Sequence, residues 1–118
     1  MVRKIKFYRT KSGNSPVEQF IDSLKSKQAQ KVLWVLRLIE EIDSVPARYF
    51  KKLVNTENLW EVRIDFGSDT FRLLGFFDGK TVVVLMHGLR KKSQKLSKQA
   101  IALAQERKKE YFRRKRHE

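Results

Sequence analysis

The sequence predicts an α+β fold, a small antiparallel sheet with an N-terminal helical hairpin and a basic C-terminal helix. Three observations favour this fold. Apolar residues recur at helical spacing early in the chain, they alternate with polar residues from about residue 49 onward, and positive charge gathers near the C-terminus. A length of 118 residues suits one domain, so we expect residues 1–118 to form a single domain.

A strand and two helices are predicted in the first part of the chain. Residues 4–9 alternate as a strand does, and Ser15 and Pro16 mark a helix start, because serine caps helices and proline suits their first position. Apolar residues then follow at helical spacing: Val17, Phe20, Ile21 and Leu24 in the first helix, and Val32, Val35, Leu36, Ile39 and Ile42 in the second. We expect these helices to lie as a hairpin on the sheet.

Three or four antiparallel strands and a helix complete the predicted order. In residues 60–66 the apolar side chains point one way, while Glu61, Arg63 and Asp65 point the other. Residues 70–77 and 81–89 are joined by a sharp turn signal and are apolar on both faces, as central strands are. Ser97 caps a last helix that runs from residue 98 to about residue 116.

Positive charge is the strongest compositional signal. The chain has 27 Lys and Arg against 13 Asp and Glu, a net charge of +14. Twelve of these cations lie from Arg90 onward, where there are only three acids. Such a concentrated excess favours binding to nucleic acid, because each neutralised phosphate releases counterions. The alternative is a solvated basic tail that only aids solubility.

Several classes of protein and site are excluded by what the chain lacks. It has no cysteine and two histidines, so disulfides and thiolate metal sites are excluded and no metal or other cofactor is expected. The N-terminus lacks the apolar core of a signal peptide, and no apolar run approaches the roughly 20 residues of a membrane span. We therefore expect a cytoplasmic protein that does not bind membranes.

Two arginines on predicted strands are candidate phosphate ligands. Arg72 lies in a segment that is otherwise hydrophobic, where charges are rarely left without a partner. An arginine aimed from a rigid strand into a partly apolar cleft suits bidentate contact with a phosphate. Arg63 lies on the polar face of its strand, where a second interpretation is a solvated residue paired with Glu61 or Asp65.

His87 ends the last predicted strand, on the face expected to hold Val83 and Leu85. It is either a hydrogen-bonded core residue or a proton-exchanging group, since an ordinary histidine pKa of about 6.5 permits exchange at cellular pH. Tyr49 and Phe50, beside further lysines, either stack on unpaired bases or belong to the core. The predicted catalytic residues are Arg63, Arg72, His87 and Lys91, and the predicted nucleic-acid-binding residues are Lys51, Lys52, Arg90, Lys92 and Lys95.

Known hydrolytic motifs are missing from the sequence. It contains no paired carboxylates with metal-ligand spacing and no glycine-rich phosphate loop. Cleavage of a phosphodiester would therefore have to proceed without a metal, which is open to RNA because its 2′-hydroxyl can act as the nucleophile. Cations arranged around the pentavalent phosphate would then supply the electrostatic stabilisation.

Three segments resemble a known family in order and spacing. They are Leu59-Trp60-Glu61-Val62-Arg63, Phe71-Arg72-Leu73 and the stretch from Val84 to Lys95, VLMHGLRKKSQK. Over nearly the whole chain, the sequence resembles the phage-related HigB branch of the RelE/ParE toxin superfamily. The resemblance implies a RelE-like fold and the toxin of a type II toxin–antitoxin pair, which cuts messenger RNA in the ribosomal A site.

The resemblance also implies partners and roles. The partners are a cognate antitoxin, expected to be a helix-turn-helix protein, and the ribosome with its mRNA. Arg63 and Arg72 would bind the phosphate or the transition state, Lys91 and Lys92 would contact RNA or the ribosome, and His87 would lie near the active cleft. Two alternatives stay open, a ParE-like inhibitor of DNA gyrase that cuts nothing and an inactive homologue that still binds its antitoxin.

Overall fold

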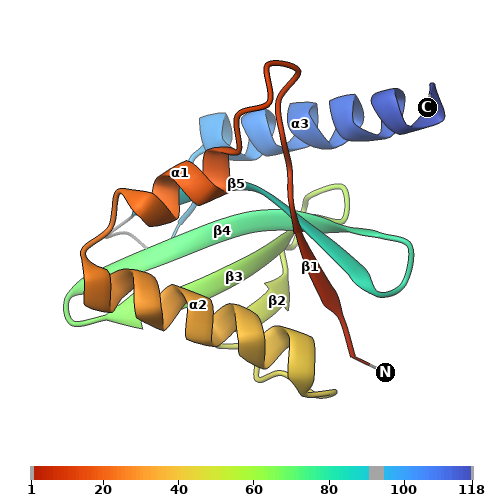
Figure 1. The fold of residues 1–118 in the computed structure, drawn as a ribbon. Coiled ribbons are helices and arrows are strands. Elements are labelled where there is room, and N and C mark those ends of the chain that lie inside the picture. The colour runs from red at the N-terminus through yellow and green to blue at the C-terminus, as the bar shows by residue number, and fades with distance from the viewer. Residues whose placement is uncertain (1, 91–94, 118) are drawn as a thin grey trace.

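The structure is a computed structural model that describes residues 2–90 and 95–117. Its elements are, in chain order, β1 (Lys4–Phe7), α1 (Pro16–Asp22), α2 (Ser26–Glu41), β2 (Phe50–Lys52), β3 (Trp60–Phe66), β4 (Asp69–Asp78), β5 (Val82–Arg90) and α3 (Lys98–Arg116). They form one five-stranded sheet, with α1 and α2 on one face and α3 on the other (Figure 1). The α+β class, the helical pair and the basic last helix are confirmed.

The sheet is mixed, although the sequence predicts an antiparallel one. Its strand order is β1-β5-β4-β3-β2, and β2 to β5 pair antiparallel as expected. β1 pairs in parallel with β5, because the helical pair carries the chain from β1 to the opposite edge of the sheet before the other strands form. The first strand therefore lies beside the last.

The core beneath α1 and α2 is built as the helical spacing predicts. Ser15 Oγ accepts a hydrogen bond from the backbone N–H of Glu18, and Pro16 is the first helical residue. Buried side chains of both helices pack against one face of the sheet. The helices contribute Val17, Val32, Val35 and Ile39, and the strands contribute Ile64, Leu73 and Leu85, among others. Each such burial stabilises the fold by roughly 1.5–3 kcal/mol.

The opposite face of the sheet packs against α3. The apolar residues on this side include Leu74, Phe76, Val84, Met86 and Ala104. Tyr111 and Phe112 extend the apolar packing of α3 into the charged half of this helix, since the centres of their rings lie 5.2 and 5.3 Å from that of Phe76. The basic helix is thus docked along most of its length.

A β-bulge in β5 decides which residues face α3. Leu74 pairs with His87 and Gly75 pairs with Leu85, so Met86 is one residue extra. Because a bulge shifts the alternation of a strand by one position, the residues after it point to the opposite face. Gly75 suits this site, since a Cβ there would lie 2.5 Å from the carbonyl oxygen of Val84.

Candidate functional site

A cleft of about 330 Å³ opens on the α3 face of the sheet. It lies between β2, β3, β4 and the residues that lead into α3, with Leu96 and Ile101 forming part of its wall. Its charged lining residues are Lys51, Glu61, Arg63, Arg72 and Lys95. Four residues that the sequence predicts as site residues therefore meet in one cavity, together with one carboxylate.

Arg63 and Arg72 are direct cross-strand neighbours in this cleft. Like charges directly opposite on adjacent strands destabilise a sheet. Each arginine has a carboxylate near it: Arg63 Nε lies 3.4 Å from Asp65 Oδ1, and Arg72 Nε lies 3.6 Å from Glu61 Oε2. The pair forms a concentrated, fixed positive site, which is the arrangement that a bound phosphate favours.

Burial distinguishes the two arginines. Arg72 is only 2 % exposed and lies beneath the cleft surface, whereas the side chain of Arg63 is 22 % exposed and partly open to solvent. The prediction that Arg72 could not lie unpaired on an apolar strand is confirmed by its ion pair with Glu61. Because few water molecules screen the buried guanidinium of Arg72, its electric field acts more strongly on a group bound in the cleft than that of an exposed arginine would.

Glu61 is the site residue that the sequence reasoning missed. The sequence suggests it only as a surface partner of Arg63, but it is 2 % exposed, lines the cleft and pairs with Arg72. The signal was present in the strand pattern. Glu61 shares a strand face with Arg63, so it must point toward the same cavity as the arginine that needs a counter-charge.

The predicted nucleic-acid-binding residues divide between the two faces of the sheet. Lys51 pairs with Glu61 on the cleft side, whereas Lys52 pairs with Trp60, which packs in the core beneath α1 and α2. Arg90 also lies on that second side, with its guanidinium 5.1 Å from the centre of the Phe71 ring.

The remaining contacts of Arg90 hold it there. Its Nη2 donates to Gln28 Oε1 of α2 at 3.4 Å, and its Nε lies 3.9 Å from Asp69 Oδ1. Arg90 and Lys52 are therefore not brought to the cleft. Lys91 and Lys92 lie outside the described residues.

His87 faces α3, and the prediction that it shares a face with Val83 and Leu85 is wrong. The bulge at Met86 reverses the alternation, so that His87 pairs with Leu74 and lies on the α3 side of β5. Its Nδ1 is 3.5 Å from Arg107 Nη1, which also donates to the carbonyl oxygen of Met86 at 2.7 Å. Leu74 separates His87 from Glu61 in the row of residues across the sheet.

The pKa of His87 is lowered from its usual value, first by burial and then by the positive charge of Arg107. Both causes disfavour the imidazolium form, so the ring is neutral at cellular pH. Arg107 can donate to Nδ1, which leaves the ring proton on Nε2. His87 thus carries no charge toward the cleft.

Base stacking on Phe50 is contradicted by its surroundings. Phe50 is 6 % exposed and stacks on Trp60, with ring centres 4.7 Å apart, so it belongs to the core. The ring of Tyr49 lies edge-on to Trp34 and has the guanidinium of Arg48 4.8 Å from its centre. These aromatic residues therefore build the edge of the sheet around β2.

Over residues 2–90 and 95–117, no group of three or more His, Asp or Glu side chains is placed to hold a metal ion. Within the same residues, no helix is long and apolar enough to cross a membrane.

The chain matches a known family model. The family model described as phage derived protein Gp49-like (DUF891) matches residues 19–109, which include every residue that lines the cleft. No curated protein matches the chain at a significant level.

Proposed function

Because the chain belongs to the Gp49-like family of phage-derived proteins, a family of the RelE/HigB-type toxins of toxin–antitoxin systems, we propose that it is a ribosome-dependent endoribonuclease that cuts messenger RNA. The family supports a toxin role and implies an antitoxin as partner. In this proposal the antitoxin is a helix-turn-helix protein, the toxin acts in the cytoplasm, and mRNA on the ribosome is its substrate.

The observation that carries the proposal is the opposed pair Arg63 and Arg72 in a cleft that Lys51 and Lys95 also line. The two arginines would bind the scissile phosphate and stabilise the charge that grows on it. Removing one such donor from a preorganised site costs about 10²–10³ in rate. The lysines would hold the neighbouring backbone phosphates of the same strand.

RNA itself would supply the nucleophile, its 2′-hydroxyl, and the protein would move two protons. The leaving 5′-oxygen needs a proton donor, for which the predicted catalytic residues offer Lys91 and His87. A lysine is ordinarily charged at pH 7, whereas the lowered pKa of His87 leaves its imidazole neutral. Lys91 therefore suits the acid role better, and DNA, which lacks the hydroxyl, would bind without being cut.

The first test is brief induction of the protein in bacteria, with the 5′ ends of cellular transcripts mapped. We expect new ends in phase with codons, which appear in translated regions only. Arg72→Lys keeps the buried charge but loses the bidentate fork, so cleavage should fall at least tenfold. Arg37→Gln, on an exposed position of α2, removes an arginine remote from the cleft and should leave cleavage unchanged.

Other outcomes would identify the alternatives. Chromosome breaks with intact messages would replace the proposal with gyrase inhibition. Cleavage of naked RNA at the same rate as ribosome-bound RNA would indicate a free nuclease. Folded protein that arrests nothing and cuts nothing, yet binds its antitoxin, would identify an inactive homologue.

A further inference from the structure

We propose that Glu61 is the general base of the cleft, the group that takes the proton from the attacking 2′-hydroxyl. This inference rests on the proposed function and adds to it the residue that activates the nucleophile. Glu61 is the one carboxylate among the described residues that line the cleft, where the other charged lining residues are cations. It comes from β3, so its backbone is held on both sides by β2 and β4.

A carboxylate in this position weakens the binding of a polyanion. It is 2 % exposed, and burying a charge is costly even when it is paired. It also repels every phosphate that enters the cleft. A residue that served binding alone would be better replaced by a neutral one, so the presence of Glu61 calls for a role in which a negative charge is needed.

Compensation of the arginine charge does not by itself require a carboxylate inside the cleft. Arg63 has its counter-charge in Asp65, whose side chain is 61 % exposed and which is not part of the cleft lining. The two arginines are paired in the ladder, and of their described carboxylate contacts that of Arg72 lies within the cavity whereas that of Arg63 lies outside its lining. The position of Glu61 therefore exposes what the cavity holds to a carboxylate.

The geometry places Glu61 beside the phosphate site. Its Oε2 lies 3.6 Å from Nε of Arg72, so a phosphate on that guanidinium is in the immediate neighbourhood of the carboxylate. Along β3, Glu61 and Arg63 are two residues apart, about 6.6 Å at a strand rise of about 3.3 Å per residue. That offset matches a nucleotide whose phosphate lies on the arginines and whose ribose lies over Glu61.

The chemical step then balances. The 2′-hydroxyl gives its proton to the Glu61 carboxylate as the 2′-oxygen forms a bond to phosphorus. The bond from phosphorus to the 5′-oxygen breaks, and that oxygen takes a proton from a general acid, which is left as its conjugate base. The products are a 2′,3′-cyclic phosphate and a 5′-hydroxyl end, with no other reactant needed.

The test separates chemistry from binding with Glu61→Gln, which keeps the shape of the side chain and removes its charge. Ribosomes with a filled P site and a short end-labelled mRNA serve as substrate for single-turnover cleavage. The same mRNA with 2′-O-methyl groups on the A-site codon serves for affinity. We expect the rate to fall at least 100-fold, as for loss of a general base, while affinity stays equal or becomes tighter.

Two further variants complete the design. Glu61→Asp keeps a negative partner for Arg72 but withdraws it from the ribose, and should lower the rate at least tenfold with affinity unchanged. Asp65→Asn makes the same carboxylate-to-amide change at the exposed partner of Arg63, and should alter the rate less than threefold.

The result can go against Glu61 in two ways. If Glu61→Gln cleaves within threefold of the unmodified protein, Glu61 is not the base. If rate and affinity fall together in both Glu61 variants, Glu61 only positions Arg72. When Glu61→Gln does not fold, as checked by thermal unfolding, the outcome with Glu61→Asp decides. Absence of cleavage by the unmodified protein would instead refute the proposed function.

Discussion

A single histidine shows how strongly neighbours set the chemistry of one side chain in this fold. His87 faces α3, where burial and Arg107 lower its pKa. The unfolded chain binds a proton at its ordinary pKa of about 6.5, and the folded protein does so only at lower pH. The stability that the neutral imidazole gives is therefore complete above pH 6.5 and is lost as the pH falls through the folded-state pKa.

This linkage predicts a loss of stability in mild acid. The midpoint of thermal unfolding should fall between pH 7.5 and pH 5, and His87→Gln should remove most of that fall, because the histidine that gains a proton on unfolding in this window is then absent. Calorimetry across the pH range provides the measurement. His117→Gln, at the exposed end of α3, is the matched control and should retain the original pH dependence. Identical profiles for His87→Gln and the unmodified protein would refute the linkage.

Residue-level predictions from sequence succeeded where strict alternation holds and failed where it does not. Arg63 and Arg72 meet as expected, since both lie in regularly paired parts of β3 and β4. The prediction of the sheet face to which His87 points was wrong, because a bulge changes the alternation of a strand without leaving a clear pattern in the sequence. The role of Glu61 was missed because a nearby exposed acid, Asp65, offered an equally simple partner for Arg63.

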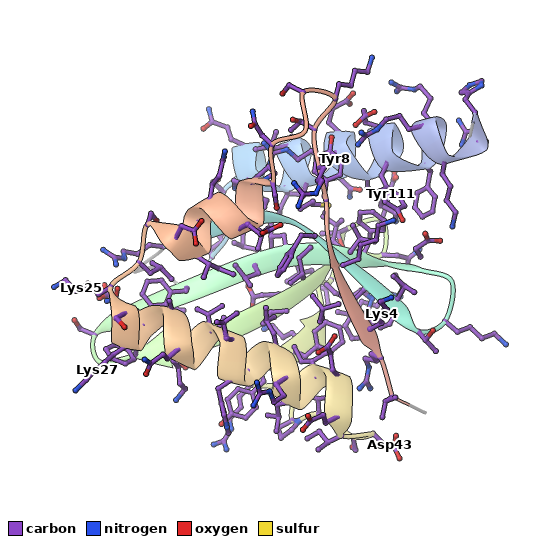
Figure 2. The ribbon with its side chains drawn as sticks, viewed as in Figure 1. Lys4, Tyr8, Lys25, Lys27, Asp43 and Tyr111 are labelled. Atoms are coloured by element: carbon purple, nitrogen blue, oxygen red, sulfur yellow. The ribbon has the colours of Figure 1, made fainter. Side chains whose placement is uncertain are left out.

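At the scale of elements, α3 is fastened to the sheet by polar contacts as well as by apolar packing. Tyr111 donates a hydrogen bond to Asp78 Oδ2 at 2.7 Å, and Lys115 Nζ lies 2.7 Å from the same carboxylate. Tyr8, just after β1, donates to Glu110 at 2.6 Å, so both tyrosines join α3 to the strands beneath it (Figure 2). These contacts fix the helix whose N-terminal end borders the cleft.

The contact with Asp78 yields a stability prediction. Tyr111→Phe keeps the ring but removes the hydrogen bond, which should lower the free energy of unfolding by about 1 kcal/mol.

Hydrogen bonds from Lys115 and Tyr111 lower the pKa of Asp78 in the folded protein. The stability that the Asp78 carboxylate contributes is therefore present above its ordinary pKa of about 4 and is lost as the pH falls through the folded-state pKa.

Urea unfolding measures both effects. Asp78→Asn should flatten the decline in stability between pH 5 and pH 3, while Asp22→Asn, an exposed acid at the end of α1, should not. An unchanged stability of Tyr111→Phe would show that the hydrogen bond to Asp78 adds nothing to the docking of α3.

Sequence patterns identified the elements better than their pairing. The spacing of apolar residues, the capping residues and the turn signals predicted both helices of the hairpin and the two long strands, because these elements depend on local sequence. The partner of β1 depends on where the chain returns after two helices, which is a property of the whole path. β2 spans only three residues, too short for its alternation to stand out.

At the scale of the whole molecule, the charge of +14 is spread over surfaces with different tasks. Several cations of α3 serve the fold, including Arg107, Lys108 and Lys115, through hydrogen bonds to other parts of the chain. Lys109, Arg113 and Arg116 are exposed on the same helix. A truncation would remove both kinds of residue, so substitution is the better test of what the basic helix binds.

Replacing Lys109, Arg113 and Arg116 together by glutamine should weaken ribosome binding and reduce its salt dependence. If all three contact RNA phosphates, the slope of log affinity against log salt should fall by about 2, at about 0.7 per contact. A sedimentation assay over 50–300 mM salt measures it. Replacing Lys11, Lys27 and Arg37, exposed cations on other elements, changes the net charge equally. Equal slopes for the two triple variants would show that only the total charge matters.

The extra residue Met86 in β5 makes this strand tolerant of a change in its length. A variant that lost Met86 would restore regular alternation with His87 still opposite Leu74, so the four positions from His87 to Arg90 would keep their faces. Gly88 would still face α1, where it lets the ring of Phe20 approach, and the α3 side would lose only the apolar side chain of Met86. A single-codon deletion would thus regularise the strand without turning any other side chain to the opposite face.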